Sequence, residues 1–445
     1  TKGALEEMLA VSNYVEYKDE IIPLTDQVRE DVLAEVTQLN EQGLRVLGVS
    51  YKSNLEEGYA FEVADEADMI LTGYLAFLDP PKPSAAPAIN TLAEYGVATK
   101  ILTGDNEKVT QAVCEKVGLD VDRILLGSDI DSLSDSDLAQ AVEITTVFAK
   151  LSPDQKARII LQLKANGHKV GYMGDGINDA PSMKVADVGI SVDTAVDIAK
   201  ETADVILLDK DLMVLEKGLV EGRKVYANMT KYIKMTVSSN FGNIFSLLFA
   251  SIFLPFLPMA PIHLIVLNLV YDLSCIALPF DRVDKDFLKK PRIWEAKSIT
   301  RFMAWFGPIS SVFDILTFIT LYFIIVPMIT GYGYVHGAES AGLFIMLFQT
   351  GWFIESMWSQ TMVIYMLRSP KLPFVQSRPA LAVMATTLLG ALLVTFLPYG
   401  PLASLLKVAP LNSLYFLLLA GILFLYMASV TLVKHYYIGK YKEWL

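Results

Sequence analysis

The residues best suited to do chemistry lie in one short run, Met173–Pro181, which reads Met-Gly-Asp-Gly-Ile-Asn-Asp-Ala-Pro. Its pattern predicts a strand, a glycine-flanked turn and the start of a helix. The carboxylates of Asp175 and Asp179 stand four residues apart around that turn. Carboxylate oxygens suit Mg²⁺, which neutralises charge on a phosphoryl group during its transfer. The run therefore predicts a magnesium-dependent phosphoryl-transfer site, with Asn178 opening the next helix toward the same pocket.

Two further motifs fall directly after predicted strands. Thr103-Gly104-Asp105 offers a hydroxyl and backbone N–H groups at a helix start, which is an anion site. An ordinary helix cap at Asp105 would have the same sequence. Lys156 lies in the first turn of another predicted helix, where the helix dipole disfavours a cation. Either a phosphoryl group or plain solvation of a surface lysine accounts for it.

The elements that must position these motifs alternate from about residue 73 in the manner of a doubly wound α/β fold. Ligands of such sheets bind at the carboxyl ends of the strands, where all three motifs fall. The expected strands are 97–102, 146–150, 169–173, 187–191 and 204–208, and the expected helices are 105–118, 154–166, 179–185 and 194–201.

The second half of the chain has the composition of a membrane protein. The 445 residues are 53% hydrophobic with a mean hydropathy of +0.40, and apolar residues dominate from about 236 onward. Each membrane-spanning helix needs roughly 20 apolar residues. Six runs meet that length, at about 237–257, 261–280, 302–326, 342–367, 380–398 and 412–433.

Basic residues are concentrated in alternate loops of this half. They precede the first run at Lys224, Lys231 and Lys234, recur in 282–301 and 368–378, and follow the last run from Lys434, whereas 258–260 and 327–341 have none and 399–411 has only Lys407. By the positive-inside rule, the soluble half and both chain ends are expected in the cytosol.

Three carboxylates fall within the predicted spans, at Asp272, Asp314 and Glu355. Each costs roughly 2.5–3.5 kcal/mol at mid-membrane, so each needs a partner or a role. Asn268 lies one helical turn before Asp272, and the preceding span carries two more amides, three residues apart. Oxygen ligands from neighbouring helices suit a hard cation, although interhelical hydrogen bonding would use the same residues. The expected ion site is Asn240, Asn243, Asn268, Asp272 and Glu355, whereas Asp314 fits a structural pair equally well.

Charge and cysteine content exclude other classes of protein. The net charge of −12 and pI of about 4.9 argue against a nucleic-acid partner. The two cysteines, Cys114 and Cys275, fall in different halves, so no disulfide framework is expected and a reducing compartment fits.

Taken together, the three soluble motifs resemble the haloacid-dehalogenase-like phosphorylation domain of P-type ATPases. The run at 173–181 is highly specific for that family. Further matches are Lys2-Gly3-Ala4, which resembles a nucleotide-binding motif, Arg45 within Gly43–Leu47, which resembles a phosphate-contacting segment, and Asp79-Pro80-Pro81, which resembles the hinge into the phosphorylation domain. The membrane half resembles the bacterial magnesium-transporting (type III B) branch through 77–82, 231–243, 253–265 and 306–318.

The resemblance implies a domain plan and a function. Residues 1–72 would be the end of a nucleotide-binding domain, 73–225 the phosphorylation domain and 226–445 a transmembrane domain with six spans. The activity implied is ATP-driven movement of Mg²⁺ into the cytosol through an aspartyl phosphate, with ATP and Mg²⁺ as cofactors. The implied setting is a bacterial inner membrane, where the lipid bilayer, anionic lipids included, is a partner.

Roles for individual residues follow from the same resemblance. Asp175 and Asp179 would hold the catalytic Mg²⁺, Lys2, Gly3 and Arg45 would contact ATP, and the phosphoryl group would be met by Thr103, Gly104, Asp105, Lys156 and Asn178. Asn240, Asn268 and Asp272 would line the transported-ion site. Asn243 departs from the Glu that calcium pumps carry, which argues against a two-ion calcium site.

The family's phosphorylated Asp, in a DKTGT motif, is not among these residues. We therefore expect the C-terminal half of a pump, with the upstream half in the same polypeptide. Other readings stay open, namely a calcium, proton or lipid pump, or a membrane-tethered phosphatase. A non-catalytic nucleotide-binding membrane sensor is a further reading if the chain is complete.

Overall fold

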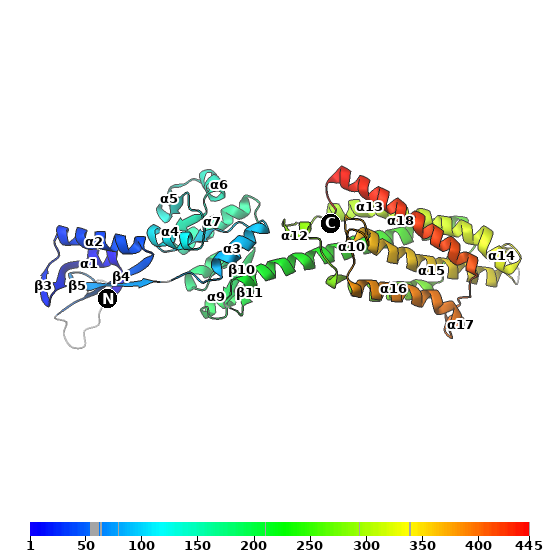
Figure 1. Cartoon of the computed structure of the whole chain (residues 1–445), viewed down its shortest axis with the longest axis horizontal. Helices are drawn as coiled ribbons and strands as arrows, with labels where there is room; N and C mark the ends of the chain where they lie inside the picture. Colours follow the sequence, from blue (N-terminus) through cyan, green and yellow to red (C-terminus); the bar gives the residue numbers. More distant parts are fainter. Residues whose placement is uncertain are drawn as a thin grey trace. The chain divides into compact units, whose positions relative to one another are not determined.

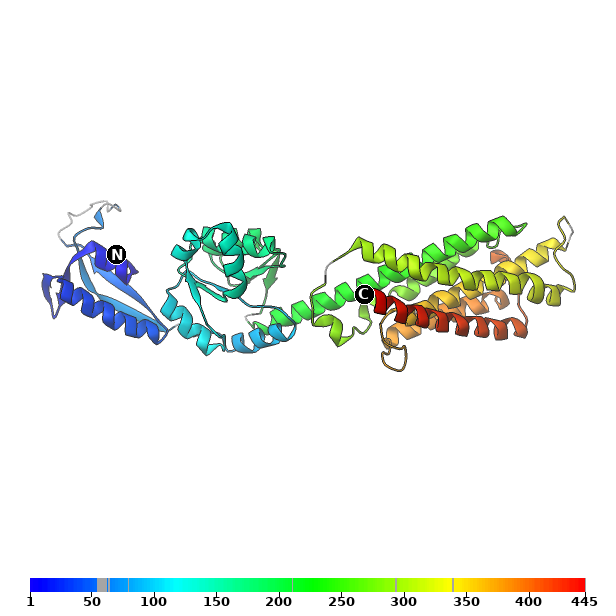
Figure 2. The ribbon, with the colours of Figure 1, turned by 90° about the horizontal axis from the view of Figure 1, so that it is seen from above.

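The computed structural model describes residues 1–53, 62, 65–78, 80–209, 211–292, 294–337 and 340–444. Asp79 of the expected hinge lies outside the described residues. The chain divides into two compact units, Thr1–Gly218 and Leu219–Leu445. Figures 1 and 2 show the first as mixed helix and sheet and the second as a bundle of long helices.

The first unit opens with a five-stranded sheet in the order β1-β4-β5-β2-β3. Its strands are β1 (Lys2–Ala4), β2 (Ser12–Tyr17), β3 (Glu20–Pro23), β4 (Leu44–Tyr51) and β5 (Met69–Leu78), and two helices, α1 (Leu5–Val11) and α2 (Asp26–Glu41), accompany it. Leu5, Leu9 and Val36 of the helices are buried in one core with Leu71 of the sheet. The helices therefore cover one face of the sheet.

The rest of this unit is the expected α/β region, built from two three-stranded parallel sheets, β6-β8-β7 and β11-β10-β9. The strands are β6 (Ile101–Leu102), β7 (Ile124–Leu126), β8 (Val147–Ala149), β9 (Gly171–Met173), β10 (Val188–Val192) and β11 (Val205–Leu207). The helices are α3 (Ala85–Glu94), α4 (Glu107–Lys116), α5 (Gly127–Ser132), α6 (Asp135–Ile144), α7 (Pro153–Ala165), the 3₁₀ turn η2 (Ile177–Asp179), α8 (Ala180–Val185) and α9 (Asp197–Thr202).

All five strands and four helices expected from 97 to 208 are present, with ends shifted by up to four residues. Strand β7 was not predicted from the sequence, although at three residues it is as long as the predicted strands β8, β9 and β11. Helix α7 begins where its capping box places it, since Ser152 and Gln155 exchange hydrogen bonds between side chain and backbone. That cap fixes the position of Lys156 in the first turn.

The second unit is helical. Its elements are α10 (Met213–Phe253, which begins in the first unit), α11 (Pro261–Cys275), η3 (Leu278–Phe280), α12 (Lys285–Leu288), α13 (Ala296–Thr320), the π-helical turn η4 (Leu321–Ile325), α14 (Val326–Thr330), α15 (Ala341–Leu367), α16 (Leu381–Phe396), η5 (Leu397–Tyr399), α17 (Ala403–Leu406) and α18 (Ser413–Tyr441). Pro261 is the first residue of α11, as expected of a proline near a helix start.

Five segments among the described residues are long and apolar enough to cross a membrane: Met213–Phe253, Pro261–Phe280, Ala296–Thr330, Leu381–Tyr399 and Ser413–Tyr441. Many of their outward side chains are large and apolar, such as Ile252 (76% exposed) and Leu432 (73% exposed). A surface of this kind belongs in lipid. The unit is therefore an integral membrane bundle.

The expected span 342–367 corresponds to α15, which has 27 residues but is not one of those five segments. Gln349 and Glu355 lower its hydropathy. Every residue of α15 from Phe344 to Leu367 is buried or half-buried. It is the central helix of the bundle, and its polar residues face other helices instead of lipid.

Small residues let the helices approach closely around α10. A Cβ on Gly242 would lie 2.9 Å from the carbonyl oxygen of Gly307 in α13, and Ser311 of α13 donates a hydrogen bond to the Gly242 carbonyl at 3.0 Å. Close backbone approach through small residues is a common basis of helix packing in membranes. It places α10 directly against α13.

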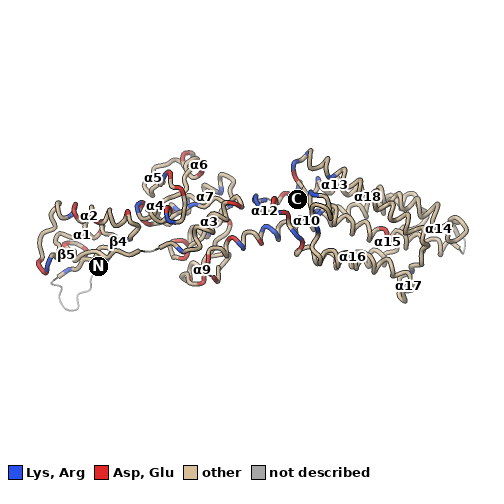
Figure 3. Tube along the Cα trace, in the orientation of Figure 1, with Lys and Arg blue, Asp and Glu red and all other residues tan. Residues whose placement is uncertain are grey.

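Lys and Arg of the bundle are concentrated at the end that carries α12 and the chain's C-terminus (Figure 3). Three lysines assigned to loops from the sequence lie instead within helices and are buried: Lys231, Lys234 and Lys434. Lys231 pairs with Asp281 at 3.1 Å, and Lys434 donates to three backbone carbonyls. These side chains therefore link the ends of neighbouring helices through buried ion pairs and hydrogen bonds, in addition to contributing positive charge.

Candidate phosphoryl-transfer and ion sites

The centre of the predicted site is a hydrogen-bonded cluster around Asp179, just beyond strand β9. Oδ1 of Asp179 accepts from Lys156 Nζ at 2.9 Å and from the Tyr172 hydroxyl at 2.7 Å, and Oδ2 accepts from the backbone N–H of Gly176 at 3.3 Å. The Lys156 and Asp179 side chains are only 11% and 15% exposed. Lys156 is therefore a buried partner of the motif, which rules out the solvated-lysine reading.

Titration properties of this cluster follow from its contacts. Burial alone would raise the pKa of Asp179, but hydrogen bonds from Tyr172 and Lys156 and the lysine charge outweigh burial and leave it below its usual value. Burial, and then the hydrogen bond to Asp179, raise the pKa of the Tyr172 phenol, so Tyr172 stays a donor. Tyr172 was missed from the sequence because an apolar-looking strand residue carries no signal of its hydroxyl's partner.

Gly174 is required by the closeness of Asp179. A Cβ at position 174 would lie 2.4 Å from the Cβ and 2.6 Å from the Cγ of Asp179. Real Cβ contacts do not reach such distances, so a larger residue would displace the aspartate. The glycine thus allows the turn to fold back onto the end of β9.

We predict that Gly174→Ala destabilises the first unit by about 1–3 kcal/mol, the usual cost of overpacking. The measurement is the thermal midpoint of the protein. Gly218→Ala is the matched control, because a Cβ there meets nothing within 4 Å. Equal midpoints for the two variants would contradict the steric argument.

A second prediction concerns Lys156→Met, which leaves the buried Asp179 carboxylate without its cation. Breaking a buried pair costs about 3 kcal/mol. Because the folded pKa of Asp179 is lowered, its contribution is present at neutral pH, above the unfolded pKa. It is lost as pH falls through the folded pKa.

The difference in unfolding free energy between Lys156→Met and the unsubstituted protein should therefore be large at pH 7 and narrow in acid. Lys108→Met is the control, since Lys108 pairs with Glu41 at 3.1 Å on the surface, where such pairs contribute at most about 1 kcal/mol. A difference that stays constant with pH would show that Asp179 does not depend on Lys156.

The Thr103–Asp105 motif forms a tight turn after β6. The backbone N–H of Asp105 donates a hydrogen bond to Thr103 Oγ1 at 3.1 Å, and the Lys150 N–H donates to the Asp105 carbonyl at 2.8 Å. Asp105 is not the helix cap, because α4 begins at Glu107 and Asn106 caps it. The capping alternative is therefore wrong, and the Asp105 carboxylate instead lies 2.6 Å from Arg45 Nη2.

Unlike Asp179, Asp175 has a carboxylate that is free to bind a ligand. It is exposed, and among the described residues its carboxylate has no hydrogen-bond or ion-pair partner. Its backbone carbonyl accepts from Val196 N–H at 3.1 Å, which holds the turn. Asn178 is exposed on the same turn. A free carboxylate held by a fixed backbone fits a Mg²⁺ ligand that keeps several waters, although the described residues include no cluster of three His, Cys, Asp or Glu that would enclose a metal.

Lys2 and Arg45 lie on one face of the five-stranded sheet. Lys2 pairs with Val49 and Ala4 with Leu47, so residues 45, 47 and 49 of β4 share the face of Lys2. Both Lys2 and Arg45 are exposed. Gly3 lies on the opposite face, where a Cβ would reach the side chain of Met8 in α1 at 3.0 Å. The face that the helices leave open carries the two cations.

The expected ion-site residues divide into two groups in the bundle. Asn240, Asn268 and Asp272 are exposed, and Asn243 is half-buried. Glu355 is fully buried instead, beside Asp314 of α13. For Asp314, the sequence favoured a structural pair and an ion path equally. The described residues do not enclose all five in one pocket.

Three family models match the chain in order. "P-type ATPase, cytoplasmic domain N" matches residues 1–84, "haloacid dehalogenase-like hydrolase" matches 50–187, and "Cation transporting ATPase, C-terminus" matches 256–436. The α/β region and the helical unit thus agree with the matched families.

The curated relatives of this chain are also P-type ATPases. The chain is 50% identical over 440 residues to "Magnesium-transporting ATPase, P-type 1" of Salmonella typhimurium and 49% identical to the protein of that name in Escherichia coli, covering 99% of this chain and 48% of each relative. A "Calcium-transporting ATPase 1" of Bacillus cereus is 34% identical over 66% of this chain and 33% of its own length. The chain spans about half the length of the curated relatives it matches. With three successive family models and this identity along its whole length, the chain belongs to the P-type ATPase family.

Proposed function

We propose that the chain is part of an ATP-driven pump that moves Mg²⁺ across a bacterial inner membrane through an aspartyl-phosphate cycle. The observation that carries the proposal is the free Asp175 carboxylate next to the locked Asp179–Lys156–Tyr172 cluster. The 50% identity to magnesium-transporting relatives favours Mg²⁺ over the other cations. The domain plan that we propose from the sequence is 1–72, 73–225 and 226–445, and strand β5 of the first sheet runs six residues past the first of these boundaries.

The nucleophilic aspartate comes from residues outside this sequence. The positions of β6 and β9 support this. Each is an edge strand of its three-stranded sheet and is paired on one side only among the described residues. A further parallel strand between them would join the two sheets and end beside both the Thr103 turn and Asp175. Leu102 and Val170 already pack against the cores of both sheets.

In the proposed mechanism Asp175 would hold the catalytic Mg²⁺, which would supply positive charge to neutralise the transferring phosphoryl group. Asp179 positions the turn and keeps Lys156 fixed near the phosphoryl oxygens. Thr103 and Asn178 donate hydrogen bonds to the same oxygens. Preorganised donors of this kind stabilise a transition state without rearranging during the reaction.

ATP binds on the open face of the five-stranded sheet. Lys2 and Arg45 supply positive charge there for the phosphates, and exposed Leu47, Leu75 and Phe77 offer an apolar surface for the base. Register supports one shared face, since Arg45 pairs with Phe77 and Leu47 with Leu75. Arg45 also pairs with Asp105 of the phosphorylation site, so nucleotide binding would compete for that ion pair.

In the membrane, we propose six spans, namely the five long apolar segments and, at the centre of the bundle, α15. Asn240, Asn268 and Asp272 line the path of the ion. An exposed carboxylate at mid-membrane is costly against lipid, which favours helices from the upstream half, or water, over that face. The basic end of the bundle faces the cytosol by the positive-inside rule, and Mg²⁺ moves toward it.

The test is phosphoenzyme formation from labelled ATP by the purified full-length protein, followed across a Mg²⁺ titration and after hydroxylamine. A hydroxylamine-sensitive band stimulated by Mg²⁺ is expected. A folded protein that binds ATP but forms no band would instead be a sensor. Stimulation by Ca²⁺ alone would favour a calcium pump, the activity named for the Bacillus cereus relative.

A further inference from the structure

The short segment after α18, Lys442–Trp444, folds back into the bundle and is held there. Lys442 ends the helix in a left-handed backbone conformation, with a φ of 52°, which turns the chain away from the helix axis. Trp444 is then only 6% exposed. Its indole N–H donates to the backbone carbonyl of Leu367 in α15 at 3.2 Å. A buried tryptophan with a paired N–H is typical of the anchor residues of binding interfaces.

The slot that receives this tryptophan has aromatic walls. The ring of Trp444 lies 5.3 Å from Phe302 and 5.6 Å from Phe306 of α13, and 6.1 Å from Tyr437 of α18, measured between ring centroids. The ammonium of Lys434 lies 5.7 Å from the centroid of the Trp444 ring, at the distance of a cation–π interaction. The segment therefore contacts α13, α15 and α18 through one side chain.

Helix α10 is joined to the same segment through Lys234, which is 3% exposed. Its ammonium donates to Ser298 Oγ of α13 at 2.8 Å and to the backbone carbonyl of Trp444 at 2.9 Å. No carboxylate of the described residues lies within ion-pair distance of Lys234. A buried charge without hydrogen bonds is costly, so Lys234 depends on these two acceptors. One of the two belongs to the segment after α18.

The contacts of Glu443 are closer to water. Its Oε1 accepts from Arg301 Nη1 at 2.9 Å and from the Tyr437 hydroxyl at 2.8 Å. The Arg301 and Glu443 side chains are 36% and 25% exposed, and ion pairs that water reaches are weak. The Trp444 carbonyl is the one backbone group of Glu443 and Trp444 with a hydrogen bond in the described part of the chain. The segment can therefore leave its slot without unfolding a helix.

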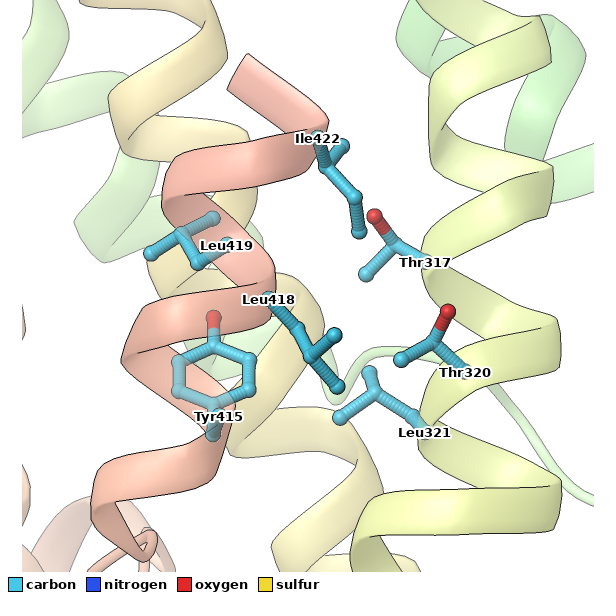
Figure 4. A pocket seen from close by; sticks show the side chains of 7 residues that line it. All are labelled: Thr317, Thr320, Leu321, Tyr415, Leu418, Leu419 and Ile422. Carbon is cyan, nitrogen blue, oxygen red and sulfur yellow. The ribbon is translucent and has the colours of Figure 1, made fainter. Parts of the chain in front are cut away.

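The interface between α13 and α18 is less well filled several helical turns away. Figure 4 shows a small cavity of about 10 Å³ between them, with Leu321, Leu418 and Ile422 among the residues that line it. Side chains that face a cavity lose packing contacts on that side. Packing at this level therefore restrains the two helices less than the contacts around Trp444 do.

We propose that Lys442–Trp444 is a releasable latch. When docked, the latch joins α10 to α13, α15 and α18 at the basic end of the bundle and restrains α10. Asn240 and Asn243 lie on α10 within three turns of Lys234, so a shift of α10 that moves them also pulls on the latch. The requirement that the latch opens during turnover rests on the proposed function. Its docking rests on the contacts alone.

A reversible crosslink tests whether the latch must open. Ser298 Oγ and Glu443 Oε1 are 3.5 Å apart, so a short reducible thiol crosslinker should join Ser298→Cys and Glu443→Cys in the full-length protein. The native Cys114 and Cys275 are both buried. We expect the crosslink to lower ATP hydrolysis at least about tenfold, because such motions limit turnover in many enzymes. A thiol reductant should restore the rate.

The single variants Ser298→Cys and Glu443→Cys, treated with the same reagent, are the controls and should keep their rates. Two results would overturn the proposal. A crosslinked protein that hydrolyses ATP at its reduced rate would show that the contact is permanent. A folded double variant that does not crosslink would show that the segment is not docked beside Ser298.

A second measurement needs no ATP hydrolysis and decides the question if the double variant does not fold. Glu443→Gln removes the charge that pairs with Arg301, so the latch should open more often and a soluble quencher should reduce tryptophan fluorescence further. The increase should vanish when Trp444→Phe is added. Glu221→Gln is the matched control, because Glu221 pairs with Lys224 on the surface of α10.

Quenching that is the same in Glu443→Gln and in the unsubstituted protein would overturn the latch. This outcome is separate from that of the proposed function. Normal phosphoenzyme with unchanged quenching removes only the latch. Increased quenching in a protein that forms no phosphoenzyme removes only the pump.

Discussion

Asp175→Asn should lower phosphoenzyme formation from ATP by at least about 100-fold, the scale of losing one preorganised electrostatic group in an active site. Asp175 is exposed and unpartnered, so the substitution breaks no contact of the described fold. Asparagine keeps the shape but removes the charge that holds Mg²⁺. The thermal midpoint and membrane insertion should stay unchanged while the labelled band disappears.

Asp122→Asn is the matched control for this experiment. Asp122 is an exposed aspartate just before β7, at the amino end of its strand and thus at the opposite edge of the sheet from the site. It should form phosphoenzyme normally. Normal phosphorylation in Asp175→Asn would remove Asp175 from the catalytic site.

Asp272→Asn should abolish cation-stimulated ATP hydrolysis and leave the soluble unit folded. The physical reason is that Asp272 is the charged member of the exposed group that also contains Asn240 and Asn268. Neutral amides alone bind a divalent ion weakly, because most of the attraction comes from the carboxylate. The measurement is ATP hydrolysis by the full-length protein across a Mg²⁺ titration, with at least a tenfold loss of stimulation expected.

Asp286→Asn provides the comparison, since Asp286 is exposed in α12 and, within the described part of the chain, forms ion pairs only on the surface, with Lys289 and Lys371. Its Mg²⁺ dependence should match that of the unsubstituted protein. Unchanged ion dependence in Asp272→Asn would place the cation elsewhere. Glu355, the buried carboxylate of the expected ion site, would then be the next ligand to test.

Most of the α/β region could be predicted from residues close together in the chain. The run at 173–181 marks the turn after β9, and Ser152 with Gln155 marks the start of α7, because caps and glycine turns act over three or four residues. The membrane runs were equally clear for five segments. For α15 the hydropathy is diluted by polar residues, which only a central position in the bundle explains.

Contacts between distant residues needed the tertiary structure. The sequence placed Asp175, Asp179 and Lys156 at strand ends, since motif spacing is local, but the partners of Lys156 depend on how α7 packs against the turn after β9. Tyr172 donates to Asp179 because their backbones meet there. Likewise Asp314 and Glu355 are 41 residues apart, and only the packing of α13 against α15 makes them neighbours. The types of the reactive side chains and their local spacing can be read from the sequence. Which of these side chains are buried, and which residues contact them, depends on how distant segments pack in the fold.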